Sequence, residues 1–296
     1  MSQETVYAIA SGKGGVGKTT TTVNLGTALA QAGERVALVD ADLGMANLAG
    51  FVSLRPDSTT LHDVLAGDAS IDDATYQLTD NIVAVPSGTD LDAYADTSPE
   101  GLRDVVAELR STYDYVILDV GAGVSHETVL PLGLADAVVL VSTPEPAAVH
   151  DAKKTLELTG RAGGEVAGLV VTRTRPDTDV SYEELAARLD LQLLGTIPED
   201  PAARESVYAG TPLVVHDPDG PAALAYRRLA GDVAGIEAPG RPPTARNPAP
   251  SATESQSDRS TARTDDRPTD RSADEGKREA AHDDVSSAIT EAETDH

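Results

Sequence analysis

Residues 11–20 read SGKGGVGKTT, a run in which four glycines surround two lysines. Residues 12–19 match the pattern G-x-x-x-x-G-K-[ST] of a phosphate-binding loop at each required position. Glycine lets the backbone turn tightly and approach a ligand, so successive backbone N–H groups can form a concavity for anions. The sequence therefore predicts a site for nucleotide phosphates. Its candidate residues are Gly12, Lys13, Gly14, Gly15, Val16, Gly17, Lys18, Thr19 and Thr20.

The polar side chains of this loop have distinct chemistry. The ammonium group of Lys18 would reach the β- and γ-phosphate oxygens, and the Thr19 hydroxyl would complete the coordination of Mg²⁺. A glycine-rich turn without a ligand would need neither of these side chains. Lys13 is not required to form the concavity, although the whole chain has only five lysines. It is either a functional cation or a solvated loop charge.

Acidic residues follow two other apolar runs. Asp40 and Asp42, in VDADLGMANL (39–48), are two apart and therefore point to the same side of an extended chain. Asp119 ends the apolar run in YVILDVGAG (115–123), a Walker B pattern in which the aspartate binds Mg²⁺ through water. Each could be a hydrated turn at the end of a strand, but the neighbouring phosphate loop favours a metal site.

The rest of the pattern indicates the elements that would position these residues. Strands are predicted at 5–10, 35–40, 81–86, 113–120, 136–142, 165–171 and 191–197. Helices are predicted at 18–32, 60–67, 98–110, 146–160, 181–189, 202–209 and 221–235. Apolar strands that alternate with helices indicate a mainly parallel sheet covered on both faces. This is the doubly wound α/β class, whose functional residues gather at the carboxyl ends of the strands.

Composition limits the partners and cofactors. The chain has 49 acidic and 23 basic residues, a net charge of −26, so it should repel DNA and anionic lipids. This acidic, lysine-poor composition resembles proteins of salt-loving microbes, and we expect a halophilic archaeal source. The absence of cysteine excludes disulfides, thiolate zinc sites and cysteine-held iron–sulfur clusters. No apolar run could span a membrane and no secretory signal opens the chain, so we expect a cytoplasmic protein.

A change of composition near residue 237 divides the chain. Residues 237–296 are rich in Pro, Ser, Thr, Asp and Arg and have almost no large apolar side chains, so they cannot offset the entropy of ordering. We expect a folded nucleotide-binding domain at 1–236 and a disordered tail at 237–296, in which 277–292 has the spacing of a short helix. The tail has 14 acidic and 8 basic residues, which leaves the folded part with a net charge of −20.

The early lysine of K-G-G-x-G-K-[ST] marks the deviant form of the phosphate loop, and here the chain resembles the MinD/ParA family of ATPases. The resemblance runs in order through residues 5–236. The stretches DADLGMANL, VVTR (170–173) and IPED (197–200) are similar to the MinD branch. The resemblance implies a P-loop fold, ATP and Mg²⁺ as ligands, and a homodimer that forms with ATP.

The resemblance also implies roles for individual residues. Lys13 would reach across the dimer interface to the partner's nucleotide, as a second catalytic lysine beside Lys18. Asp42 would orient or activate the attacking water, and Asp40 would hold a water bound to Mg²⁺. Asn47, together with the glycine at position 44, would belong to the same switch.

Two more segments take roles from the resemblance. Gly121 and Gly123 would form a second switch that moves when the γ-phosphate leaves. The family usually has proline where Gly121 stands, so this switch should be looser here. Residues in the segments after the last two strands would enclose the adenine base. They are Thr172, Arg173, Pro198 and Glu199.

These features favour an ATP-dependent dimerisation switch that positions other assemblies in the cell, with an unidentified protein activator or cargo. A ParA-type DNA-partitioning ATPase is the alternative, but it needs a basic surface that so acidic a domain does not indicate. A metal-cluster carrier would need cysteine ligands, and a small-molecule kinase would not explain Lys13. No lysine or arginine follows Arg278, so we expect no basic membrane-binding helix at the C-terminus. Recruitment to a membrane or pole would then have to come from a partner or from the tail.

Overall fold

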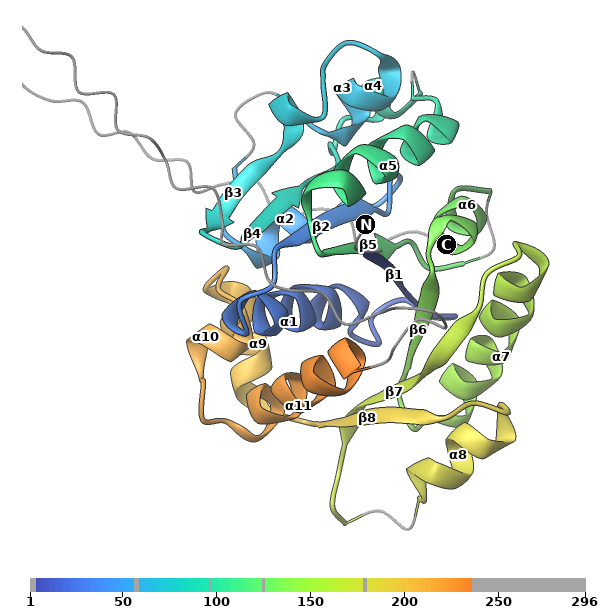
Figure 1. Cartoon of the computed structure of the whole chain (residues 1–296). Helices are drawn as coiled ribbons and strands as arrows, with labels where there is room; N and C mark the ends of the chain where they lie inside the picture. Colours follow the sequence, from blue (N-terminus) through green and yellow to red (C-terminus); the bar gives the residue numbers. More distant parts are fainter. Residues whose placement is uncertain (1–3, 56–58, 96, 124–125, 178–179, 236–296) are drawn as a thin grey trace, which may run out of the picture. The chain divides into compact units, whose positions relative to one another are not determined.

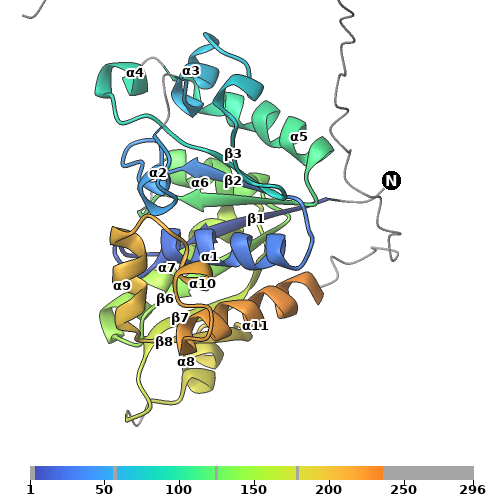
Figure 2. The same ribbon diagram turned by 90° about the vertical axis from the view of Figure 1, so that its left-hand side faces the viewer.

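The computed structural model describes residues 4–55, 59–95, 97–123, 126–177 and 180–235 (Figure 1). The tail expected at 237–296 lies outside the described residues, so its disorder stays a prediction. A central sheet runs through the described part of the chain, with helices on both of its faces (Figures 1 and 2). The expected α/β class is thereby confirmed.

The sheet has eight strands in the order β3-β4-β2-β5-β1-β6-β7-β8. Their bounds are β1 Thr5–Ala10, β2 Val36–Ala41, β3 Tyr76–Thr79, β4 Ile82–Val85, β5 Tyr115–Val120, β6 Ala137–Ser142, β7 Val166–Thr174 and β8 Leu193–Pro198. The pairs are parallel except that β3 runs antiparallel to β4 at the edge. The parallel register places Asp40 of β2 directly beside Asp119 of β5. Both carboxylates therefore reach the same edge of the sheet.

Helices cover the two faces of this sheet. Their bounds are α1 Lys18–Gln31, α2 Leu48–Phe51, α3 Leu61–Ala66, α4 Leu91–Ala95, α5 Leu102–Thr112, α6 His126–Leu134, α7 Pro146–Arg161, α8 Tyr182–Arg188, α9 Pro201–Tyr208, α10 Leu213–His216 and α11 Pro221–Gly235. Short 3₁₀ turns lie at Asp72–Ala74 and Pro99–Gly101. In Figure 1, α1, α9, α10 and α11 lie on one face, and α5, α6, α7 and α8 lie on the other. Among the described residues no helix combines the length and apolarity needed to cross a membrane.

The buried strands divide their side chains between the two faces. Tyr7 and Ile9 of β1 join a core with Leu25 of α1, whereas Val6 of the same strand packs with Leu109 of α5. Successive side chains of a strand point to opposite faces, so a strand covered on both sides must be apolar throughout. The continuous apolar runs of the sequence have this cause.

Every strand and helix expected within residues 5–236 is present, with ends shifted by at most a few residues. The possible helix at 277–292 lies outside the described residues. The expected helix 98–110 begins as the 3₁₀ turn Pro99–Gly101 and continues as α5. The sequence pattern did not predict β3, α2, α4, α6 or α10. The strand β3 is a half-exposed edge strand of four residues, so it lacks the apolar signal of the others. The helix α6 contains Pro131, which weakens its helical pattern.

Candidate functional site

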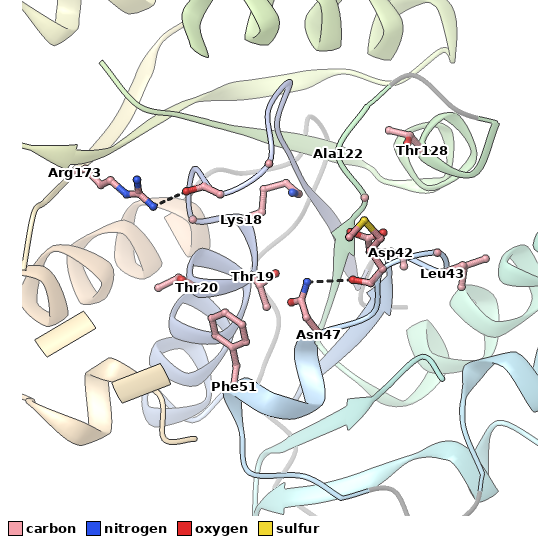
Figure 3. A pocket seen from close by; sticks show the side chains of 17 residues that line it. Lys18, Thr19, Thr20, Asp42, Leu43, Asn47, Phe51, Ala122, Thr128 and Arg173 are labelled. Atoms are coloured by element: carbon pink, nitrogen blue, oxygen red, sulfur yellow. Dashed lines mark hydrogen bonds between the residues drawn. The ribbon is translucent and has the colours of Figure 1, made fainter. Parts of the chain in front are cut away.

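The carboxyl ends of β1, β2, β5 and β7 surround one cavity of about 710 Å³ (Figure 3). Its wall combines the loop after β1, the start of α1, the loop after β2, and the residues that follow β5 and end β7. The lining residues are Gly14, Gly15, Gly17, Lys18, Thr19, Thr20, Ala41, Asp42, Leu43, Gly44, Met45, Asn47, Phe51, Gly121, Ala122, Thr128 and Arg173. Most of the residues predicted for the site from the sequence are thus brought together.

The loop of residues 11–17 has the geometry that an anion site requires. Gly17 precedes α1 with φ +97°, a left-handed conformation that favours glycine. Gly12 packs directly on α7, where an added Cβ would lie 2.1 Å from the backbone carbonyl carbon of Asp151. Lys18 then begins α1, so the free N–H groups of that helix end face the cavity. Figure 3 shows Lys18 extending toward the part of the cavity where Asp42 lies.

Two residues of β7 donate hydrogen bonds to the phosphate loop. The hydroxyl of Thr172 donates to the carbonyl of Val16 over 2.6 Å and lies 3.3 Å from the carbonyl oxygen of Ser142. The guanidinium of Arg173 donates to the carbonyl of Gly15 over 2.5 Å. Arg173 itself has φ +53°, an uncommon conformation for a residue with a side chain. The end of β7 therefore helps to set the shape of the phosphate loop.

Of the four residues expected to enclose adenine, only Arg173 lines the described cavity. Arg173 lines the cavity, whereas Thr172 is buried against the phosphate loop. Pro198 ends β8, and Glu199 pairs with Arg175 over 2.5 Å. Neither Pro198 nor Glu199 belongs to the wall that the described residues form around this cavity. Their contact with a base stays a prediction.

Thr19 and Asp119 lie in direct contact. The hydroxyl of Thr19 donates to Oδ2 of Asp119 over 2.5 Å, and the hydroxyl of Thr22 donates to Oδ1 over 3.0 Å. Burial raises the pKa of Asp119, while the hydrogen bond from Thr19 and the charge of Lys18 act in the opposite direction. Because the Thr19 proton is used on Asp119, the lone pairs of its oxygen remain able to bind a cation. Hydroxyl and carboxylate oxygens fit Mg²⁺, a hard cation that prefers oxygen ligands.

Asp40 is buried at the base of the loop that carries Asp42. Its Oδ2 accepts hydrogen bonds from the backbone N–H groups of Asn47 (3.0 Å) and Leu48 (2.9 Å), and its Oδ1 accepts one from that of Asp42 (3.3 Å). Burial raises its pKa, and the adjacent charge of Asp119 raises it further. Asp40 therefore holds both ends of the switch loop 42–47. Its expected hold on a Mg²⁺-bound water stays a prediction.

Asp42 lies against the segment that follows β5. A Cβ atom added to Gly121 would be 2.9 Å from Oδ1 of Asp42, so glycine leaves the room that this carboxylate occupies. Gly123 has φ +118°, and the residues at 124–125 are outside the described part of the chain. Asn47 donates from its side-chain amide to the carbonyl of Met45 over 3.2 Å. The two expected switch segments thus meet at Asp42 and Gly121.

Lys13 occupies a different position from Lys18. It is exposed and does not belong to the described wall of the cavity. Its charge reaches two carboxylates of its own chain. A hydrogen bond from Thr143 is the main cause that lowers the pKa of Glu145, and the charge of Lys13 lowers it slightly further. A hydrogen bond from Lys154 is the main cause that lowers the pKa of Asp151, and Lys13 again has a smaller effect. Lys13 is therefore an exposed charge that acts on Glu145 and Asp151 and lies outside the described wall of the cavity.

Six lining residues were not named from the sequence: Ala41, Leu43, Met45, Phe51, Ala122 and Thr128. Met45 is 79% exposed, Phe51 is the single phenylalanine of the chain, and Thr128 lies in α6. Phe51 belongs to α2, a four-residue helix whose pattern is too short to recognise. The place of Met45 within the stretch DADLGMANL was the one sequence signal that could have been noticed.

A phosphate loop between β1 and α1, with Thr19 bound to an acid at the end of β5, defines a P-loop nucleotide-binding domain. A model of the CobQ/CobB/MinD/ParA nucleotide-binding domain matches residues 7–213 of this chain. The chain belongs to this family, as the resemblance at the level of motifs implied. The expected halophilic source stays a prediction.

Individual relatives agree with this result. An uncharacterised ATP-binding protein of Methanocaldococcus jannaschii is 38% identical over 231 residues, which make up 78% of this chain and 88% of that protein. The structure of the septum site-determining protein MinD of Pyrococcus horikoshii, complexed with Mg-ADP, has a TM-score of 0.73 and 36% identity, and the match covers 77% of this chain and 95% of that one. A chain of the MinC:MinD cell division protein complex of Aquifex aeolicus has a TM-score of 0.70 and 28% identity, covering 82% and 99%.

Proposed function

We propose that this protein is a Mg²⁺-dependent ATPase of the MinD type, which dimerises when it binds ATP and separates after hydrolysis. The observation that carries the proposal is the arrangement of one cavity with Lys18 on one side and Asp42 on the other, above the Thr19–Asp119 pair. Relatives described as ATP-binding, and a MinD complexed with Mg-ADP, support ATP and Mg²⁺ as ligands.

The reaction would be attack of water on the γ-phosphate, in which the protein contributes positions and charges rather than covalent steps. Lys18 and the N–H groups at the start of α1 would bind the phosphate oxygens and stabilise negative charge as it shifts. Thr19 would bind Mg²⁺ directly and Asp119 through water, and the ion would neutralise phosphate charge. Asp42, on the opposite wall, would orient the attacking water.

We also propose contacts with the adenine base and a role for Lys13 at the dimer interface. Thr172, Arg173, Pro198 and Glu199 remain the candidates for contact with adenine. Lys13 would act on the nucleotide of the partner subunit, which its exposed position and its absence from the described cavity wall support. A dimer held by ATP would place the two phosphate loops face to face, where a cation from each subunit offsets phosphate repulsion.

The cellular role would be the positioning of another assembly through a protein activator or cargo. The MinC:MinD complex of the Aquifex relative supports a protein partner. The acidic composition makes DNA an unsuitable partner, and recruitment to a membrane or pole would depend on the bound protein.

Hydrolysis and binding are tested together by two variants. Asp42→Ala should bind ATP but hydrolyse it at least about 100-fold more slowly, as expected for loss of a group that orients or activates the nucleophile. Lys18→Ala should lose ATP affinity itself. Calorimetry and phosphate release, with and without Mg²⁺ and with GTP for comparison, measure both. Parent-like turnover of Asp42→Ala would remove Asp42 from the mechanism, and equal affinity for GTP would contradict the adenine assignment.

A further inference from the structure

A second cavity of about 220 Å³ lies next to the loop that carries Asp42. Leu43, Gly44 and Met45 line both this cavity and the nucleotide cavity, so the loop separates the two spaces. The remaining wall of the second cavity includes His62 of α3 and Gly88, which follows β4. Any group that fixes this wall also fixes the loop on which Asp42 is placed.

His62 makes such a connection. Its side chain is buried, with 1% exposure, and Nε2 lies 3.0 Å from the backbone carbonyl oxygen of Leu43, the residue after Asp42. A carbonyl oxygen can only accept a hydrogen bond, so Nε2 must carry the hydrogen and donate it. In the neutral ring the lone pair is then on Nδ1.

The other ring nitrogen has no comparable contact. Nδ1 of His62 is the one buried side-chain nitrogen or oxygen of the described residues that lacks a hydrogen-bond partner. It faces Gly88, where an added Cβ would lie only 2.9 Å from Nδ1. A buried polar atom without a partner is unfavourable and calls for an explanation. The bond from Nε2 to the Asp42 loop gives a reason for an imidazole at this position.

We propose that His62 is a positioning residue for ATP hydrolysis, which holds the carbonyl of Leu43 and thereby sets the place of Asp42. The proposal rests on the proposed ATPase function and on the role of Asp42 in it. His62 does not line the nucleotide cavity, so it acts through the loop alone. The phosphate loop, Lys18 and Thr19 have no part in this connection, and nucleotide affinity should be independent of it.

The connection can be broken from two sides. His62→Leu removes the donor, whereas His62→Gln retains an amide N–H that can reach the position of Nε2. Gly88→Ala retains the histidine but brings a Cβ to 2.9 Å from Nδ1, which should displace the imidazole from Leu43. Gly160→Ala in α7 is the matched control, because an added Cβ there meets nothing within 4 Å.

We expect kcat to fall about tenfold in His62→Leu and in Gly88→Ala, with an ATP Kd within about twofold of the parent, since a small misplacement of a reacting group is costly. His62→Gln should recover most of the parent kcat, and Gly160→Ala should retain it. The proposal is overturned if His62→Leu and Gly88→Ala both keep the parent kcat, or if His62→Gln is as slow as His62→Leu. Asp42→Ala, measured in parallel, shows whether the proposed ATPase function itself holds.

Hydrogen exchange gives a readout that does not depend on hydrolysis. The backbone N–H groups of Asn47 and Leu48, which bind Asp40 at the end of the same loop, should exchange faster in His62→Leu and at the parent rate in His62→Gln. Unchanged exchange in His62→Leu would contradict the connection even if the parent protein did not hydrolyse ATP.

Discussion

Oδ1 of Asp42 lies where only a glycine at position 121 leaves room for it, because a Cβ on Gly121 would be 2.9 Å away. The contact joins the loop after β2 to the segment after β5, the two parts of the site that would sense the γ-phosphate. The position of Asp42 is therefore tied to the absence of a side chain at position 121.

Gly121→Ala should lower kcat by roughly tenfold with little change in ATP affinity, since the flexible Asp42 side chain can move away from the new methyl group. The same flexibility should keep the cost in stability below about 1 kcal/mol. Phosphate release, ATP titration and thermal unfolding measure the three quantities. Gly50→Ala, where an added Cβ meets nothing within 4 Å, is the control. A variant with parent kcat would show that Asp42 acts from another position.

Asp40 and Asp119 should make the stability of the metal-free protein depend on pH. Burial raises the pKa of both carboxyls, so the folded protein binds protons that the unfolded chain has already lost. This contribution is fully present below the unfolded pKa near 4 and is lost as pH rises through the raised folded values. The free energy of unfolding should therefore fall between about pH 5 and pH 8.

Asp40→Asn tests this dependence, because it removes one buried charge and keeps an oxygen for the N–H groups of Asn47 and Leu48. Urea unfolding with a chelator should give a flatter pH profile than the parent and a more stable protein at the upper end of the range. Asp68→Asn, at an exposed aspartate, should follow the parent. A profile of Asp40→Asn as steep as that of the parent would assign the pH dependence to other groups.

Thr172→Val should weaken both the fold and nucleotide binding. The variant keeps the shape of the side chain but leaves the carbonyl of Val16 without its 2.6 Å hydrogen bond, a loss of about 1–3 kcal/mol. Thr159→Val is the control, because its hydroxyl donates to a carbonyl inside α7. The midpoint temperature of thermal unfolding should fall by several degrees in Thr172→Val, and ATP affinity should fall as well. An ATP affinity equal to that of the parent would show that the phosphate loop keeps its shape without the hydrogen bond from Thr172.

Removal of residues 237–296 should leave folding and ATP binding unchanged, since their composition offers little apolar surface to a core. The described core already includes α11, whose Tyr226 and Val233 are buried. The thermal midpoint and the ATP Kd of 1–236 should match those of the full chain. A large fall in the midpoint would mean that the tail packs on the domain.

The phosphate loop and the strands could be predicted from the sequence because their signals are local. Gly12 is required by its close approach to α7, and Gly17 is required by its left-handed conformation. Both belong to a motif that is recognisable within a few residues of sequence. The aspartates at 40 and 119 lie side by side because the ends of parallel strands meet at one edge of the sheet, which the sequence pattern predicts.

The missed features depend on contacts between distant segments. His62 contacts the Asp42 loop from 19 residues away, and no spacing in the sequence indicates that bond. Thr172 was predicted to contact the adenine base because of the segment in which it lies. Its hydroxyl instead donates to the carbonyl of Val16, because β7 packs against the phosphate loop. The wall residue Phe51 follows from the position of α2, a helix that tertiary contacts stabilise rather than its own sequence.

ATP should join two subunits of this protein through Lys13. Light scattering of Asp42→Ala with ATP and Mg²⁺, in low and molar KCl, should show a dimer, because slow hydrolysis should leave ATP bound to this variant. The Lys13→Ala, Asp42→Ala double variant should bind ATP and stay a monomer, and Lys13→Arg should restore association only in part, since a planar guanidinium does not replace a compact ammonium. If the double variant dimerises with ATP as tightly as Asp42→Ala alone, Lys13 does not act across the interface and the account is contradicted.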